Sequence, residues 1–341
     1  MSNILILRFS AIGDVAMTVP VVDSLARQHP DNQYTVVSQP FLRSLFAGCP
    51  DNVLFYGIET KGRHKGIAGI FRLYEELRKK RFDAVADLHD VLRTKLLRFL
   101  LGCNGSKVKH IDKGRREKRM LIAGKCRYPL KSSTERYADV FCSLNMPVTL
   151  VFRSVFGNKK GDISGIEVVA GCTTGKWIGI APFAKHQGKI YPLERTEEIV
   201  RHFSARNDIT LLLFGGGETE KRLLEEWSIR YPHTISVAGK CRLSEELAII
   251  SRLEIMLSMD SANMHLASLT ATPTVSIWGA THPYAGFYGY RQSPDLAVQT
   301  NLPCRPCSIY GNKPCRRKDL ACLTQIQAKE VIDVLELIIN N

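Results

Sequence analysis

The segment SMDSANMHLASLTATPTVSIWGATHP, residues 258–283, brings together side chains that could bind a diphosphate. A buried apolar run ends there, and Asp260, Ser261 and Ala262 open a helix whose first turn carries His265. The free N–H groups of a helix start attract anions, and small residues let an anion approach them closely. An ordinary Asp N-cap followed by a buried histidine explains the same pattern equally well.

Two other stretches of the second half carry groups of the same kind. APFAKHQGKIYPLE places Lys185 and Lys189 just after a strand, where an ammonium could neutralise a leaving phosphate without a metal. In the turn FGGGETE, Glu218 or Glu220 could accept hydrogen bonds from ribose hydroxyls, and the glycines permit close backbone approach. Solvated surface lysines and a tight loop without a ligand are the simpler interpretations.

The first half opens with a strand, residues 4–8, that ends in a turn with a single glycine, Gly13, followed by Asp14. A nucleotide-binding loop at such a position normally carries several glycines. Pro20 lies too deep for the unstrained first turn of a helix that Asp14 caps, so the helix is kinked or starts near Thr18. In the second case Asp14 is free of capping and can act as a base.

DLHD, residues 87–90, follows a later strand of the same half. It is not the Asp-x-Asp pattern that binds a metal–diphosphate complex, and we therefore predict no catalytic metal and no cofactor required for catalysis. Asp87, His89 and Arg93 are candidate acceptor contacts, although a strand-end cap is an equally good interpretation.

Four cysteines crowd into the tail with the spacing Cys304-x2-Cys307-x7-Cys315-x6-Cys322. Structural zinc tolerates this spacing, but the x7 gap is not that of the usual knuckle. A disulfide or free thiols are the alternatives, and a reducing compartment favours thiols.

Strands and helices must position these residues, and the sequence predicts that strands and helices alternate along the chain. Apolar strand runs separated by helical stretches through both halves predict α/β units with parallel sheets. The Gly- and Lys-rich stretch 156–165 is the predicted linker. We therefore predict two Rossmann-like, doubly wound domains, 1–160 and 161–325, followed by a C-terminal helix, 326–341. Ligands of such sheets bind at the carboxyl ends of the strands, here in a central cleft between the domains.

Charge is distributed unevenly along the 341 residues. The net charge is +14, and residues 1–160 hold 28 Lys or Arg against 14 Asp or Glu, whereas the remainder is balanced. The excess of positive charge in the first half indicates that this half binds an acidic partner, which could be nucleic acid, an anionic membrane surface or a phosphorylated substrate. The segment 107–131 holds ten Lys or Arg and two acids, which predicts an exposed stretch. Its only aromatic residue is Tyr128, which argues against nucleic acid.

The residues also indicate the compartment. No apolar run reaches the roughly 18 residues of a membrane span, and Arg8 and Asp14 interrupt the N-terminal apolar stretch that a signal peptide would need. We therefore predict a cytoplasmic protein. Helix 92–101 combines leucines with Arg93, Lys95 and Arg98 and could lie at a membrane interface, although packing within the protein is commoner for such a helix.

The motifs LRFSAIGDVAMTVP, GKIYP and MDSANMHLASLTATPTVSIWGATHP together resemble glycosyltransferase family 9, the heptosyltransferases of lipopolysaccharide core assembly. The resemblance implies a GT-B fold with an acceptor-binding N-domain and a nucleotide-sugar-binding C-domain. It also implies inverting transfer of heptose from ADP-L-glycero-D-manno-heptose to an inner-core sugar of lipid A. The partners would then be the ADP-sugar donor, the lipid A or inner-core acceptor and the anionic inner face of the cytoplasmic membrane, with no nucleic acid.

The resemblance assigns roles residue by residue. Asp14 takes the position of the general base and Lys189 that of the phosphate-binding lysine. The expected donor contacts are Lys185, Glu220, Lys240, Cys241, Asp260, Ser261, Ala262 and His265. The expected acceptor contacts are Ser10, Gly13, Asp87, His89 and Arg93.

Two residues depart from the family pattern and weaken the case for heptose. Ala262 stands where the family usually has Gly, which matters if that residue needs a positive φ, and Tyr191 replaces the usual Trp of Lys-x-Trp-Pro. Two alternatives therefore stay open: a transferase of the same fold that uses another nucleotide sugar for capsule or glycan synthesis, and a non-catalytic protein that binds anionic ligands.

Overall fold

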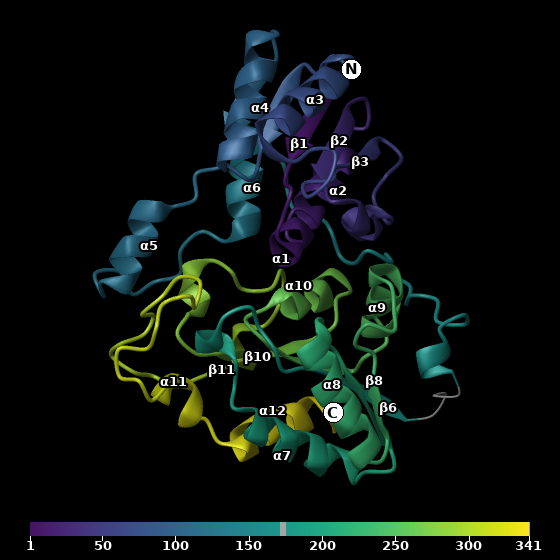
Figure 1. Cartoon of the computed structure of the whole chain (residues 1–341), viewed down its shortest axis with the longest axis vertical. Helices are drawn as coiled ribbons and strands as arrows, with labels where there is room; N and C mark the ends of the chain where they lie inside the picture. The colour runs from purple at the N-terminus through teal and green to yellow at the C-terminus, as the bar shows by residue number, and fades with distance from the viewer. Residues whose placement is uncertain (171–174, 341) are drawn as a thin grey trace. The chain divides into compact units, whose positions relative to one another are not determined.

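The computed structural model describes residues 1–170 and 175–340, and the chain divides into two compact units (Figure 1). The first unit consists of Met1–Gly114 and Lys131–Gly157, and the second of Arg115–Leu130 and Asn158–Asn341. The main crossing, at Gly157 and Asn158, falls inside the predicted linker. Two features differ from the predicted domains: residues 115–130 belong to the second unit, and so does the C-terminal helix.

The first unit is built on a five-stranded parallel sheet of order β3-β2-β1-β4-β5. Its strands β1, β2 and β4 are apolar runs that are buried along nearly their whole length, as expected for a parallel sheet covered by helices. Its elements are β1 (Asn3–Leu7), α1 (Ile12–Ala16), α2 (Val19–Gln28), β2 (Gln33–Ser38), the 3-10 helix η1 (Pro40–Phe46), β3 (Val53–Gly57), α3 (Gly66–Arg78), β4 (Ala84–Asp87), α4 (Leu92–Cys103), β5 (Lys107–His110) and α6 (Ser133–Cys142).

The second unit is built on a six-stranded parallel sheet of order β11-β10-β9-β6-β7-β8. Its strands and 3-10 helices are η2 (Glu167–Val169), β6 (Lys176–Ala181), η3 (Gln187–Lys189), β7 (Ile209–Leu213), β8 (Thr234–Ser236), β9 (Ile255–Met259), β10 (Thr274–Trp278), η4 (Pro283–Ala285), η5 (Pro294–Leu296) and β11 (Ala297–Gln299). Its α-helices are α5 (Arg115–Ile122), α7 (Leu193–Ser204), α8 (Glu218–Arg230), α9 (Leu243–Ile250), α10 (Ala262–Leu269), α11 (Ala321–Thr324) and α12 (Ala328–Ile339).

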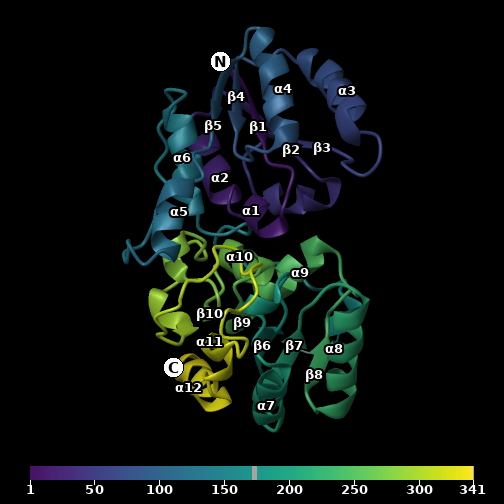
Figure 2. The ribbon, with the colours of Figure 1, turned by 60° about the vertical axis from the view of Figure 1, so that its left-hand side comes forward.

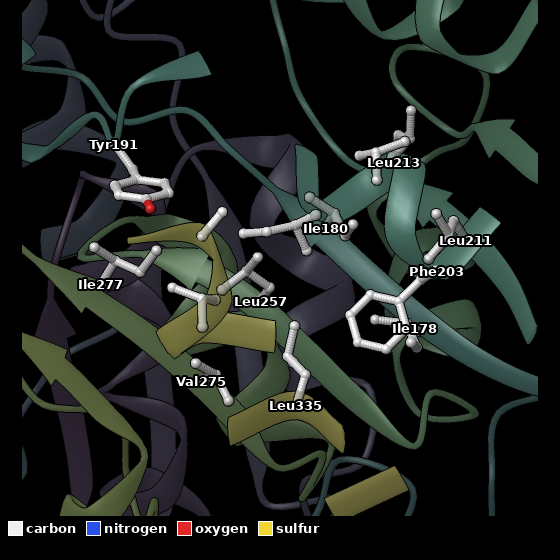
Figure 3. Packing of buried hydrophobic residues seen from close by; sticks show 14 of the residues in the cluster. Ile178, Ile180, Tyr191, Phe203, Leu211, Leu213, Leu257, Val275, Ile277 and Leu335 are labelled. Atoms are coloured by element: carbon white, nitrogen blue, oxygen red, sulfur yellow. The ribbon is translucent and has the colours of Figure 1, made fainter. Parts of the chain in front are cut away.

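The core of the second unit lies between this sheet and the helices α7 and α12. Aliphatic side chains of β6, β7, β9 and β10 meet Phe203 of α7 and Leu335 of α12 in one buried cluster (Figure 3). The apolar positions of α12 recur every three to four residues, and Val331, Leu335 and Ile339 are all buried. The C-terminal helix is therefore an integral part of the second unit.

The segment 107–131 agrees with the prediction of an exposed stretch only in part. Its first four residues form β5, an edge strand whose Lys107 and Lys109 side chains are exposed. The segment then enters the second unit, where α5 begins, and Leu121 and Leu130 join a buried cluster. The prediction of exposure is therefore wrong for Leu121 and Leu130, and also for Lys118, whose ammonium lies over the Phe287 ring, whereas most charged side chains of the segment are exposed.

Each sheet reverses its strand order once, between β1 and β4 in the first unit and between β6 and β9 in the second. The loops that leave the carboxyl ends of two such neighbouring strands diverge to opposite faces, and this is where open α/β sheets bind ligands. The residues that follow β1, β4, β6 and β9 include most of the predicted site. Among the described residues, no helix is long and apolar enough to cross a bilayer.

Candidate active site

The strand reversal of the second unit joins Lys189 to Asp260. Lys189 ends the short helix η3, which follows β6, and Asp260 follows the last residue of β9. The ammonium Nζ lies 2.8 Å from Asp260 Oδ2 and donates a hydrogen bond of 3.2 Å to the Asp260 carbonyl oxygen. The exposed fractions of the two side chains are 14% and 4%. A positive group is thus fixed at the carboxyl edge of the sheet, whereas Lys185 is exposed to solvent.

Close glycine packing holds the backbone around Lys189. Gly188 accepts a hydrogen bond of 2.8 Å from Ala280 N, and a Cβ added to Gly188 would lie 3.0 Å from the Gly311 oxygen. Gly311 has a φ of +73°, and a Cβ there would lie 2.7 Å from Lys189 Cγ. A larger residue at Gly311 would displace the lysine stem, and one at Gly188 would clash with the Gly311 backbone, so the cysteine tail, which carries Gly311, helps to shape the site.

Arg305 ties that tail to the end of β10 and was not among the predicted residues. Its guanidinium donates to the carbonyl oxygens of Gly279 at 2.6 Å, Thr281 at 2.9 Å and Trp278 at 3.0 Å. Arg305 lies 26 residues along the chain from Gly279, and nothing local in the sequence marks the contact. The arginine therefore positions the loop that packs against Gly188.

We expect Arg305→Ala to lower the free energy of unfolding of the second unit by about 2–4 kcal/mol. Hydrogen bonds from a charged donor contribute about 1.5–3 kcal/mol each, and water would replace them only in part. Urea unfolding followed by tryptophan fluorescence measures the change. Arg316→Ala, at an exposed position of the same tail, is the control, and equal effects of the two variants would contradict this role.

The start of α10 lies beside the Lys189–Asp260 pair. Ser261 is the N-cap residue, with an extended backbone, and its hydroxyl lies 3.2 Å from Ser258 Oγ. Ala262 is the first helical residue, so its φ is negative and the position does not need glycine. His265 follows in the first turn and is half-buried. The N–H groups of a first turn have no partner within their own helix, and together with the nearby ammonium they make this end of α10 suitable for an anion.

The remaining predicted donor contacts follow β7 and β8, the next strands along the edge. Glu220 Oε2 accepts a hydrogen bond of 2.7 Å from Gly216 N, so this carboxylate closes the glycine-rich turn. Lys240 forms an ion pair with Glu225 at 2.8 Å. Burial, together with Glu245 and Glu246, raises the pKa of the neighbouring Cys241 to about 11, which keeps the thiol protonated at neutral pH. In sheet order, the predicted donor residues therefore form one row along β9, β6, β7 and β8.

In the first unit, Asp14 lies at the strand reversal that follows β1. It is the third residue of α1, and its Oδ2 accepts a weak hydrogen bond of 3.5 Å from Ala11 N. The same oxygen forms an ion pair of 2.6 Å with Arg8 Nη2. The Asp14 side chain is 39% exposed and that of Arg8 8%. Asp14 is therefore oriented from one side and open to solvent on the other.

The helix after Asp14 begins where one of the two predicted alternatives placed it. Thr18 is the N-cap residue of α2, and Pro20 lies in the first turn, where it costs no hydrogen bond. The prediction that Asp14 is then free of capping is wrong, because Asp14 lies in a separate short helix, α1, and accepts a hydrogen bond from the N-cap residue of that helix. The sequence pattern could not reveal a five-residue helix in front of α2.

Arg8 is a second residue of the site that the sequence pattern does not mark. Besides its ion pair with Asp14, it donates a hydrogen bond of 2.7 Å to the Leu88 carbonyl oxygen and lies over the Tyr137 ring. Burial alone would lower its pKa, but the nearby Tyr137 and Asp14 raise it overall. The Tyr137 hydroxyl in turn donates to the Asp14 carbonyl oxygen at 3.3 Å. These contacts join the loops after β1 and β4.

Asp87 and His89, at the end of β4, have structural partners. The Asp87 carboxylate is fully buried, accepts hydrogen bonds from His89 N and Asp90 N, and pairs with Arg98 at 2.8 Å. This arrangement is the strand-end cap that was the alternative interpretation. His89 Nδ1 lies 3.4 Å from Phe9 N, which donates to it.

Of the other predicted acceptor contacts, Ser10 is half-buried, Gly13 is buried in α1, and Arg93 is exposed on α4.

The ionisation of His89 has a measurable consequence. Burial, with Arg8 and Lys113 nearby, lowers the pKa of His89 to about 3. An unfolded histidine titrates near pH 6.5, so below that pH the unfolded chain binds a proton that the folded chain does not bind. The free energy of unfolding therefore decreases as the pH is lowered below 6.5. We expect His89→Asn, whose amide oxygen can replace Nδ1, to remove up to about 1.4 kcal/mol per pH unit of this slope below pH 6.5. Urea unfolding at stepped pH measures it, with the exposed His110→Asn as control; identical slopes for wild type and His89→Asn would contradict the assignment.

The four tail cysteines are free thiols, from the exposed Cys304 to the buried Cys322. Within residues 1–170 and 175–340, no group of three or more His, Cys, Asp or Glu side chains is arranged to hold a metal ion. The geometry therefore does not fit a four-ligand zinc site, and structural zinc stays a prediction without support from it.

Comparison with known proteins identifies the family. The family model described as "Glycosyltransferase family 9 (heptosyltransferase)" matches residues 70–315. The chain belongs to glycosyltransferase family 9. The match spans both units and includes the Lys189–Asp260 pair, so this protein is a glycosyltransferase enzyme.

Relatives and solved structures agree with the family 9 assignment. The lipopolysaccharide core heptosyltransferase OpsX of Haemophilus influenzae is 22% identical over 294 residues, which cover 82% of this chain and 80% of that protein. A family 9 glycosyltransferase from Veillonella parvula superimposes with a TM-score of 0.78 at 18% identity, covering 99% and 97% of the two chains. The E. coli heptosyltransferase WaaC, solved with ADP, has a TM-score of 0.68 at 18% identity and 98% and 99% coverage. The predicted GT-B fold class is confirmed.

The two departures from the family 9 pattern are Tyr191, a core residue of the second unit, and Ala262, the first residue of α10. Tyr191 is fully buried in the core of the second unit, and its hydroxyl donates to the Ile326 carbonyl oxygen at 2.9 Å (Figure 3). Its replacement of Trp is therefore a matter of core packing. Ala262 is helical, as described above. Neither substitution changes the polar groups of the site.

Proposed function

We propose that this enzyme transfers heptose from ADP-L-glycero-D-manno-heptose to an inner-core sugar of lipopolysaccharide, with inversion at the anomeric carbon. The observation that carries the proposal is the Lys189–Asp260 pair beside the start of α10. Support for the donor comes from WaaC, which has been solved with ADP and with ADP-2-deoxy-2-fluoro heptose. Support for the acceptor comes from relatives named as lipopolysaccharide heptosyltransferases.

In this proposal the second unit binds the donor. The diphosphate lies at the N-terminus of α10, where the free N–H groups and Lys189 offset its charge. Asp260 keeps the lysine in place, since the ammonium is anchored to both the carboxylate and the backbone of that residue. The ribose and adenine extend along the row toward β7 and β8, to Glu220, Lys240 and Cys241.

Asp14 acts as the general base for the acceptor hydroxyl. Both contacts of its carboxylate, to Arg8 and to Ala11 N, use Oδ2, so Oδ1 is the oxygen that accepts the proton. As the hydroxyl oxygen bonds to the anomeric carbon, the bond from that carbon to the β-phosphate oxygen breaks, and ADP leaves with the electron pair. Lys189 then faces the additional negative charge of the leaving group.

Donor binding tests the proposal without an acceptor. Isothermal titration of the full chain with ADP, UDP and GDP, and then with ADP-heptose, is expected to show binding to the adenine nucleotides that is at least about tenfold tighter than to the other two. Preference for UDP or GDP would favour the same fold acting on another nucleotide sugar. Tight ADP-heptose binding without turnover would favour a non-catalytic binding protein.

A further inference from the structure

The outward face of α4 is apolar although it is exposed. Along this helix Thr94, Leu97 and Leu101 are buried against the first unit. The opposite side presents the exposed Leu92, Phe99 and Cys103, which we call the outer stripe, and Leu96 beside them is half-buried against the core of the first unit. The exposed fractions of Leu92 and Phe99 are 85% and 65%. A helix that covers a sheet normally turns polar residues to the solvent, so a stripe of this kind indicates a partner.

The neighbouring helix extends the apolar surface. α3 and α4 pack side by side on the first unit, as both views show (Figures 1 and 2). Ile67 and Phe71, one helical turn apart on α3, are also exposed large hydrophobic residues. Four of the exposed large hydrophobic side chains of the first unit therefore belong to two adjacent helices.

Basic residues flank the stripe. At 100° per residue, Arg93 and Lys95 lie on opposite sides of the outer stripe, and both are exposed. The two helices together carry five Arg or Lys and two Glu. Long basic side chains beside an apolar stripe can reach anionic headgroups while the stripe enters the acyl boundary, which is the pattern of a helix lying in a membrane interface.

We infer that the outer stripe of α4, with the adjoining residues of α3, docks the enzyme on an anionic lipid bilayer. The inference rests on the proposed function in one respect: a lipid-linked acceptor requires the enzyme to work at a membrane. The occupant follows from charge complementarity, because a basic rim around an apolar stripe matches anionic headgroups above acyl chains. Each basic residue near such a surface increases the affinity for the membrane about fivefold. Burial of one leucine or phenylalanine side chain increases it about tenfold or more.

The test uses the double variant Leu92→Gln/Phe99→Gln in the full chain. Glutamine keeps helix propensity, and both side chains are exposed, so the thermal unfolding midpoint is expected to stay unchanged. The matched control is Ile229→Gln/Leu337→Gln, which removes two comparably exposed hydrophobic residues from α8 and α12 of the second unit. Binding is measured by co-sedimentation with vesicles of equal parts phosphatidylethanolamine and phosphatidylglycerol, and with vesicles of phosphatidylcholine alone.

The wild type and the control are expected to bind the anionic vesicles with equal affinity, and both more tightly than the neutral vesicles. The α4 variant is expected to bind the anionic vesicles at least about tenfold more weakly than the wild type. Unchanged binding of the α4 variant, or no binding of the wild type, would overturn the inference. A wild type that is dimeric in sedimentation velocity, with an α4 variant that is monomeric, would also overturn it, because the stripe would then bind a second copy of the chain. The vesicle assay needs no donor and the ADP titration no vesicles, so the two proposals fail separately.

Discussion

Asp14→Asn is expected to lower the rate of heptose transfer by about 10²–10⁴-fold, with the Kd for ADP changed by less than about threefold. The reason is that a positioned general base contributes a factor of this size to a proton transfer, and asparagine cannot accept the proton. Asparagine can still accept from Arg8 and from Ala11 N, so the loop after β1 keeps its partners. Steady-state ADP release measures the rate, and isothermal titration measures the Kd.

Asp139→Asn is the matched control for this experiment. Asp139 is an exposed acid of the same unit that forms an ion pair with Lys131, so its substitution is expected to leave both quantities unchanged. A parallel loss of ADP binding, or a lower unfolding midpoint, in the Asp14 variant would show that the carboxylate has a structural role instead. Retention of full activity would remove Asp14 from the mechanism.

Lys189→Met is expected to lower kcat/KM by about 10²–10³-fold and to raise the Kd for ADP at least about tenfold. An ammonium fixed against a leaving diphosphate stabilises charge that develops in the transition state. The substitution also leaves Asp260, which is 4% exposed, without its cation, and a broken buried pair costs about 3–5 kcal/mol of stability.

The double variant Lys189→Met/Asp260→Asn separates the two effects. It removes the buried unpaired charge and is expected to regain part of the lost stability, as measured by urea unfolding, while activity stays low. Lys329→Met, at an exposed position of α12, is the control for a lost surface charge. If the double variant recovered activity together with stability, Lys189 would be a structural residue and not a ligand of the diphosphate.

The sequence predicted the sheets, and the edges at which the candidate residues lie, because buried parallel strands are nearly continuous apolar runs. The four strands β1, β4, β6 and β9 all have this form, and the polar residues that follow them mark the carboxyl edges. By contrast, β5 alternates lysines with other residues at an exposed edge, and its charge density concealed the strand.

The contacts that orient the site could not be predicted from the sequence. Arg8 reaches Leu88, 80 residues away, and Lys189 reaches Asp260, 71 residues away, so both depend on how the strands are ordered in the sheets. Arg305 has no local motif that connects it with the end of β10. The charged composition of segment 115–130 predicted exposure throughout, whereas Leu121, Cys126 and Leu130 are buried in a cluster with residues of the second unit far along the chain.

Heptose transfer is tested most directly by the mass of the acceptor after incubation with the purified full chain and ADP-L-glycero-D-manno-heptose. We expect an inner-core acceptor heavier by one heptose, ADP released in equal amount, and no such product with the Asp14→Asn variant. An unchanged acceptor with ADP-heptose, together with a product formed from a UDP- or GDP-sugar, would contradict it.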